Sequence, residues 1–168
     1  MALTSLDERE LLLPLYEGIH ERPLWRTFLR RLLARVQAHR IVLALRTAAD
    51  QQPVALMAAA DPVAALPDID ALSRKELIPL AALRPNRSYA LQEWLSPQGD
   101  EARKAQLRLL GEQEIAAARF IRVQSRGGHD AWLILLNDRK DFGAEDSALL
   151  TALAPHLASA LGTLAELD

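Results

Sequence analysis

Apolar residues recur at helical spacing in two segments at the start of the chain, residues 5–20 and 23–38. The stripes comprise Leu11, Leu12, Leu15, Tyr16 and Ile19, and then Trp25, Phe28, Leu29, Leu32, Leu33 and Val36. Ser5 and Glu8 have the spacing of a capping box, and Pro23 suits the first position of a helix. The pattern therefore predicts two N-terminal helices.

The spacing then changes to short, β-branched or alternating runs that are typical of strands. Residues 39–47 and 53–59 form one predicted hairpin through residues 49–52, and residues 115–124 and 130–137 form a second. The sequence Ser-Arg-Gly-Gly-His at residues 125–129 is a strong turn signal for the second hairpin. Residues 87–91 are a further short strand. Because the paired strands are close in sequence, we expect an antiparallel sheet.

The remaining segments predict helices that flank this sheet. Pro62, Pro67 and Pro79, with Pro85 directly after, cut residues 61–84 into short helices and loops, whereas residues 100–110 form a helix with Asp100 as N-cap and Gly111 as C-cap. We therefore expect one α+β domain over residues 1–168, with a helix on one or both sheet faces.

The last predicted helix, residues 144–167, carries apolar residues at alternating spacings of three and four. These residues are Leu150, Leu153, Leu157, Ala160, Leu164 and Leu167. This a/d pattern is that of a dimer seam with a second helix, although packing of the helix on its own domain fits it equally. Pro155 lies inside the helix and either bends it or marks a restart.

Charge and composition exclude several classes of protein. A net charge of −2 and a pI of 6.1 argue against nucleic-acid binding as the main role. The second helix is rich in arginine, but the first is acidic, which favours pairing between the two over a nucleic-acid or membrane face. The absence of cysteine excludes disulfides and thiolate chemistry. Without a secretory signal or an apolar run of about 20 residues, we expect a cytoplasmic protein with no membrane contact.

The polar residues show no signature of an enzyme. The four histidines, His20, His39, His129 and His156, fall in different elements and lack metal-ligand spacing. No serine lies in a nucleophile elbow. Adjacent His129 and Asp130 could form an acid–base pair, but hairpin geometry explains them better. The sequence therefore predicts neither a catalytic residue nor a metal site.

Aromatic residues suggest a place for a small molecule. Five residues in the predicted sheet, or in the segments that cover it, could line an apolar pocket with one polar group: Tyr89, Trp94, Phe120, Arg122 and Trp132. Arg119 could take the place of Arg122. Ordinary core packing is the alternative for each aromatic residue.

The sequence DFGAEDSALL at residues 141–150 is followed by LAPHL at residues 153–157. These motifs resemble the end of the PAS/GAF-like sensor domains that precede LuxR-type helix-turn-helix regulators in bacteria. YALQE at residues 89–93, RFIRV at 119–123 and DAWL at 130–133 are similar to further family segments, as are the opening helices. The resemblance is weakest over residues 61–84.

The resemblance implies a PAS/GAF-like antiparallel sheet with flanking helices, an N-terminal helical pair and a long C-terminal helix. It also implies a ligand-sensing input domain of a transcriptional regulator that forms a homodimer and relays a signal through its terminal helices. DNA would be bound only through an output domain beyond Asp168, outside this chain. Any cofactor is unknown. The alternatives are a ligand-free dimerisation module and, less favoured, an unrecognised hydrolase.

Overall fold

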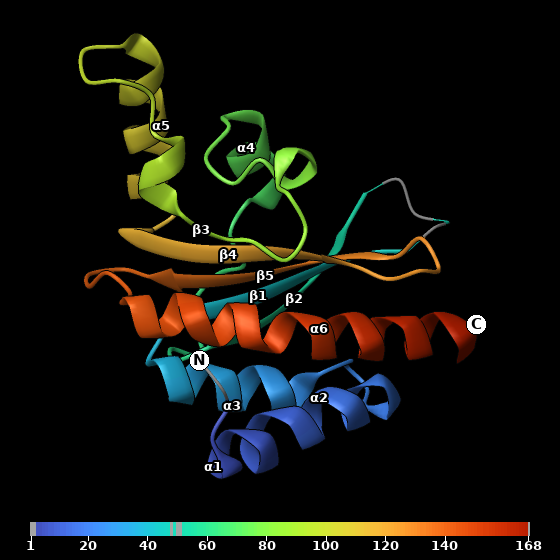
Figure 1. Cartoon of the computed structure of the whole chain (residues 1–168). Helices are drawn as coiled ribbons and strands as arrows, with labels where there is room; N and C mark the ends of the chain where they lie inside the picture. The colour runs from blue at the N-terminus through green and yellow to red at the C-terminus, as the bar shows by residue number, and fades with distance from the viewer. Residues whose placement is uncertain (1–2, 48, 50–51, 168) are drawn as a thin grey trace.

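The computed structural model describes residues 3–47, 49 and 52–167 and has a five-stranded antiparallel sheet as its central layer (Figure 1). The strands are β1 (Arg40–Arg46), β2 (Val54–Ala59), β3 (Ser88–Ala90), β4 (Ala117–Gln124) and β5 (Asp130–Asn137). Their spatial order is β2-β1-β5-β4-β3. Both predicted hairpins are present, although positions 48, 50 and 51 of the first connection lie outside the described residues. The predicted α+β class is confirmed.

The central strand β5 is buried on both faces. Ala131, Leu133 and Leu135 belong to one apolar cluster, and Trp132, Ile134 and Leu136 belong to another. Successive side chains of a strand point to opposite faces, so a strand covered on both sides must be apolar throughout. Figure 1 shows the two covering layers, with α2, α3 and α6 on one side of the sheet and α4 and α5 on the other.

The first layer starts with a continuous helical segment. It consists of α1 (Ser5–Asp7), a π-helical turn η1 (Glu8–Leu12), α2 (Leu13–Glu17) and a 3₁₀ turn η2 (Gly18–His20). The extent agrees with the prediction, but the N-cap does not. Thr4, not Ser5, forms the capping box, in which its hydroxyl accepts from the Asp7 N–H at 3.0 Å. Asp7 is fixed there because its carboxylate also accepts from Arg35 Nε at 2.9 Å.

The second helix, α3 (Arg26–Val36), begins three residues later than Pro23, the predicted first position. Trp25 has a left-handed backbone (φ 55°) just before the helix. Its backbone N–H donates to the Gly18 carbonyl at 3.0 Å, and its indole Nε1 donates to the Leu15 carbonyl at 2.8 Å. A Cβ atom at Gly18 would lie 2.4 Å from Cδ1 of Trp25, so only glycine fits there. These contacts of Trp25 with Gly18 and Leu15 therefore fix the start of α3.

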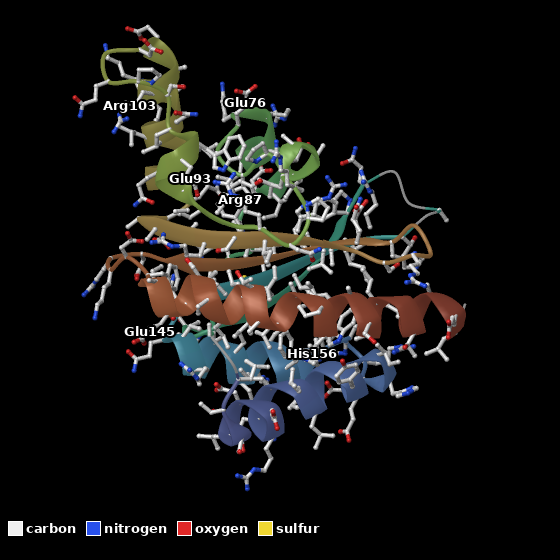
Figure 2. The ribbon with its side chains drawn as sticks, viewed as in Figure 1. Glu76, Arg87, Glu93, Arg103, Glu145 and His156 are labelled. Atoms are coloured by element: carbon white, nitrogen blue, oxygen red, sulfur yellow. The ribbon has the colours of Figure 1, made fainter. Side chains whose placement is uncertain are left out.

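The predicted charge pairing between the first two helices is confirmed for two arginines. Arg35 binds Asp7 at 2.9 Å, and Arg31 Nη1 lies 3.5 Å from the Glu10 carboxylate. Tyr16 of α2 also contacts the last helix, since its hydroxyl is 2.7 Å from Nδ1 of His156. Figure 2 labels His156 on the side of α6 that faces the N-terminal helices. These polar contacts surround the apolar interior of the first layer, the helical layer, which consists of the N-terminal helices, α3 and α6.

The last helix, α6 (Ala144–Leu167), has the predicted bounds and continues through Pro155 without a break. Five of the six residues of the candidate dimer seam are buried in the chain's own core: Leu150, Leu153, Leu157, Ala160 and Leu164. Only Leu167 is exposed, at 56%. The spacing of three and four thus serves packing within the chain, which is the alternative that the sequence left open.

α6 also corrects the expectation that the chain has no apolar run of membrane-spanning length. By length and composition alone the helix could cross a bilayer, because residues 147–165 carry no charged side chain. However, its leucine face is already buried against the sheet and the N-terminal helices. The core position accounts for the apolar sequence of this helix.

The second layer comprises α4 (Ile69–Arg74), the 3₁₀ turns η3 (Leu80–Ala82) and η4 (Leu91–Trp94), and α5 (Glu101–Glu112). Helix α5 does not end at the predicted Leu110 with Gly111 as C-cap but two residues later, at Glu112 with Gln113 as C-cap. Arg40 of β1 explains the extension, because its guanidinium donates to the carbonyls of Gln113 at 2.6 Å and Glu114 at 3.1 Å. This side chain satisfies carbonyl groups that a helix end otherwise leaves unpaired.

The position of α6 predicts that Leu157→Asp destabilises the domain. Leu157 is 1% exposed, and a carboxylate there would be buried without a partner, so we expect a loss of more than about 3 kcal/mol in the free energy of unfolding. Urea denaturation followed by circular dichroism measures this loss. Leu167→Asp is the matched control and should change the stability by less than about 0.5 kcal/mol. Equal stability of the two variants would contradict the packing described here.

Candidate ligand site

A cavity of about 260 Å³ lies between the sheet and the second layer. Strands β1, β2 and β5 form its floor, and α4 and η3 form its walls. The lining residues are Ala44, Arg46, Gln52, Pro53, Ala55, Ile69, Asp70, Ser73, Leu80, Ala81 and Trp132. Ala44 and Ala55 are opposite each other in the β1–β2 register, and their small side chains leave the floor open. The site is therefore mostly apolar, with a few polar groups on its walls.

Trp132 is the largest residue of the cavity and is held rigidly. Its side chain is 1% exposed, and its indole Nε1 donates to the Leu80 carbonyl at 2.8 Å, which joins β5 to η3. The guanidinium carbons of Arg46 and Arg122 lie 5.3 Å and 5.5 Å from the centre of its ring. These distances suit cation–π attraction, so the indole and both arginines support one another.

Asp130 holds the two arginines in place. Its carboxylate accepts from Arg46 Nη2 at 2.6 Å and from Arg122 Nη2 at 3.1 Å. Burial raises the pKa of Asp130, but hydrogen bonds from Arg46 and Gln124 and the charge of Arg122 outweigh it. The pKa of this carboxyl therefore lies below its ordinary value, and the group is ionised at neutral pH. The result is a buried ion-pair network at one end of the cavity.

The structure separates the five candidate pocket residues into two groups on the same sheet face. Trp132 lines the cavity, and Arg122 supports its wall by donating to the Ala81 carbonyl at 3.2 Å and to the Leu83 carbonyl at 3.1 Å. Tyr89, Trp94 and Phe120 instead form an aromatic cluster. The ring centres of Tyr89 and Phe120 are 6.2 Å apart, and those of Tyr89 and Trp94 are 5.6 Å apart. Arg119 points elsewhere and binds Asp141 at 3.0 Å.

Four polar residues of the cavity, Arg46, Gln52, Asp70 and Ser73, were not foreseen from the sequence. Arg46 follows Ala44 on the same face of β1, and this register could have indicated it. Asp70 and Ser73 lie on α4, in a segment whose weak periodicity gave no sign of which side chains face the sheet. Only the fold brings these two residues to the cavity.

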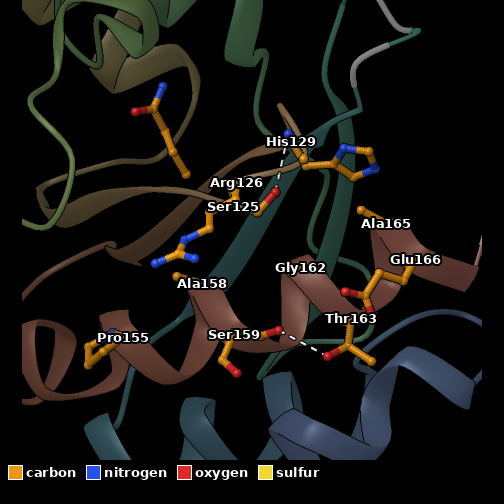
Figure 3. A pocket seen from close by; sticks show the side chains of 12 residues that line it. Ser125, Arg126, His129, Pro155, Ala158, Ser159, Gly162, Thr163, Ala165 and Glu166 are labelled. Atoms are coloured by element: carbon orange, nitrogen blue, oxygen red, sulfur yellow. Dashed lines mark hydrogen bonds between the residues drawn. The ribbon is translucent and has the colours of Figure 1, made fainter.

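A larger and more open hollow of about 710 Å³ lies between the β4–β5 turn and the second half of α6 (Figure 3). Small residues of α6 line much of it, including Ala158, Ser159 and Gly162. His129 borders it, but both of its ring nitrogens are buried and have no hydrogen-bond partner among the described residues. A molecule in the hollow could not reach these nitrogens without opening the turn. His129 therefore adds nothing to polar recognition there, and the polar lining of the hollow consists of Gln124, Ser125, Arg126, Ser159, Thr163 and Glu166.

The side chains of His129 and Asp130 lie on opposite faces of the sheet and therefore do not form an acid–base pair. Adjacent residues of a strand point to opposite faces, and Asp130 is bound to arginines on the cavity side. The histidine borders the hollow beside α6. Within residues 3–47, 49 and 52–167, no group of three or more histidine or carboxylate side chains could hold a metal ion.

No protein-family model matches the sequence, and no curated protein matches it. Solved structures match over nearly the whole chain. The N-acylhomoserine lactone dependent LuxR family transcriptional factor CepR2 from Burkholderia cenocepacia is 14% identical, with a TM-score of 0.53 and coverage of 98% of this chain and 99% of that one. The LBD domain of VqsR from Pseudomonas aeruginosa is 15% identical, with a TM-score of 0.64 and the same coverage.

A third similar structure is the red/green cyanobacteriochrome NpR6012g4 in its red light-absorbing state. It is 14% identical, has a TM-score of 0.60, and the match covers 90% of this chain and 98% of that one. At these identities the likeness is one of fold. The chain has the PAS/GAF-like fold predicted from its motifs, and this fold is shared with domains of LuxR-type regulators.

The ion-pair network predicts a specific loss of stability in acid. Because the pKa of Asp130 is lowered in the folded state, its contribution is complete above the unfolded value of about 3.9 and is lost as the pH falls through the folded value. We expect Asp130→Asn to lower the free energy of unfolding by about 1.5–3 kcal/mol at neutral pH. As the pH falls below about 3.9, the difference from wild type should shrink.

Urea denaturation between about pH 2 and pH 7 measures this difference. Asp70→Asn is the control, because the Asp70–Arg74 pair is exposed and one helical turn apart, and its loss should cost less than about 0.5 kcal/mol. If the free energies of unfolding of wild type and Asp130→Asn differed by the same amount at every pH, that result would contradict the role given to the ionised carboxylate.

Proposed function

We propose that this domain is a cytoplasmic, non-catalytic input domain of a bacterial transcriptional regulator and senses a small molecule in the cavity beside Trp132. The observation that carries the proposal is an apolar cavity on one face of the sheet. The opposite face of the same strands packs against the helical layer. The fold supports it, because regulators of the LuxR type use the same fold. DNA would be bound by an output domain outside this chain.

The size and lining of the cavity favour a small amphipathic ligand. A volume of about 260 Å³ lies below the usual range of about 300–1,000 Å³ for ligand pockets. Trp132, Leu80 and the two alanines of the floor would hold an apolar portion, and Arg46, Asp70 and Ser73 would bind a polar portion. An acyl lactone with a short chain has this character, and CepR2 depends on an N-acylhomoserine lactone.

Strand β5 connects the cavity with the helical layer. Trp132 faces the cavity, and its neighbours Ala131 and Leu133 belong to the cluster that contains α6. A ligand that binds one position of β5 more tightly than another would therefore bias the packing of α6 and the N-terminal helices. The ligand can shift this equilibrium only by its differential affinity for the two arrangements.

The ligand proposal predicts thermal stabilisation by N-butanoyl-homoserine lactone. At about 100 times the Kd, a ligand of the folded state adds about 2.7 kcal/mol, which raises the Tm of a domain of this size by roughly 5–10 °C. Ser73→Phe should abolish the shift by filling the cavity, and Arg74→Phe on the exposed side of α4 should retain it. An equal shift in both variants would place the ligand elsewhere. No shift with acyl lactones of any chain length would reject this ligand class.

A ligand-free dimerisation module is the second candidate, and exposed apolar residues of the N-terminal helices favour it. Leu6, Leu13 and Tyr16 are exposed by 59%, 53% and 39%, whereas the seam on α6 is mostly buried. If these residues form a homodimer interface, Leu13→Glu should convert a dimer into monomers. Analytical ultracentrifugation measures the change, and Leu107→Glu, at a similarly exposed leucine of α5, is the matched control. A mass that Leu13→Glu leaves unchanged would exclude this surface.

A further inference from the structure

Strand β2 is the outer strand of the sheet, and among the described residues one of its edges has no strand partner. Its sequence from Val54 to Ala59 is VALMAA, which contains neither a charged residue nor a proline. Proteins usually protect such edges with lysine, proline, bulges or a covering segment, because unpaired backbone groups invite another strand. The opposite edge of the sheet, β3, is only three residues long. The unprotected edge is therefore confined to β2.

The backbone groups that β2 leaves free can be identified from its pairing with β1. The Ala60 N–H donates to the His39 carbonyl at 3.0 Å, so this residue points its backbone groups toward β1. Because the direction alternates along an antiparallel strand, Ala55, Met57 and Ala59 point their N–H and carbonyl groups outward. An added strand would bind these three residues.

A groove of about 580 Å³ follows this edge. All residues from Ala55 to Ala59 line it, together with Leu24 and Leu29. Neighbouring side chains of a strand point to opposite faces, so consecutive residues can line one groove only where the strand edge itself is accessible. The groove therefore combines free backbone groups with an apolar wall from the α3 side.

The arginines of α3 divide into two sets. Arg31 and Arg35 face the acidic N-terminal helix and bind Glu10 and Asp7. Arg26 and Arg30, one helical turn apart, line the groove beside β2 and have no acidic partner in the described part of the chain. Two unpaired cations thus flank an unpaired strand edge.

We propose that β2 binds an extended acidic peptide segment of a partner protein as an additional strand. Backbone hydrogen bonds would supply affinity, and alternate acidic side chains on the α3 side would pair with Arg26 and Arg30. A second copy of this chain fits less well. Two β2 edges paired about a twofold axis would bring four arginines to the same side of the seam, where they repel one another.

The test uses the full chain and a fluorescein-labelled peptide, Thr-Glu-Val-Glu-Val-Glu-Thr, with fluorescence anisotropy as the measurement. We expect saturable binding that weakens as salt rises from about 50 to about 500 mM. Arg26→Glu with Arg30→Glu should weaken binding at least about tenfold. Arg108→Glu with Arg139→Glu, the same charge change at exposed positions away from the groove, should leave it within about twofold.

The backbone contribution is tested separately at Ala59. Ala59→Pro removes an outward N–H without disturbing the ladder to β1 and should weaken binding at least about tenfold, whereas Ala59→Val should retain it. Absence of saturable binding below about 1 mM, or equal binding by Ala59→Pro, would overturn the proposal. So would a dimer in sedimentation velocity that Ala59→Pro dissociates, since a second copy would then occupy the edge. None of these results depends on the ligand cavity.

Discussion

Burial of β5 on both faces is the constraint on which the rest of the structure depends. The strand contributes Leu133 and Leu135 to the helical layer, and Trp132 and Ile134 to the layer with the cavity. Neither layer can be removed without exposing half of the most apolar strand to water, at roughly 25 cal/mol for each Å² of apolar surface. The domain is therefore a three-layer unit. A molecule bound in one layer contacts residues of β5 whose neighbours along the strand pack in the other layer.

Asp130 and its two arginines add a polar counterpart to this apolar organisation. Arg46 comes from β1, Arg122 from β4, and Asp130 from β5 between them. A buried carboxylate is costly unless it is paired, so the three strands are held in one register at this end of the sheet. Arg122 extends the constraint to the second layer through the carbonyls of Ala81 and Leu83. The end of the cavity is thus fixed by charge, and the floor by packing.

Local sequence patterns were sufficient for the elements of the fold and insufficient for the site. Strand β5 and helix α6 have the bounds that their spacing predicted, because each is a long run with a single period. Long-range contacts decided the boundaries that differed: Trp25 moved the start of α3, and Arg40 extended α5. The same limit applies to the cavity. Trp132 could be selected as an aromatic residue of the sheet, but Asp70 and Ser73 reach it through a segment without a readable pattern.

The contact between Gly18 and Trp25 has a mechanical consequence for the helical layer. With no room for a Cβ atom at Gly18 and two hydrogen bonds from Trp25 into the preceding segment, the first helical segment and α3 cannot slide past each other. They form one rigid unit, which contacts α6 next to this joint through Tyr16 and His156. Because the first helical segment extends from this joint to Ser5, a small tilt of α3 beside β2 would displace the end at Ser5 more than the joint itself, so that a distance probe attached near Ser5 would report events at the sheet.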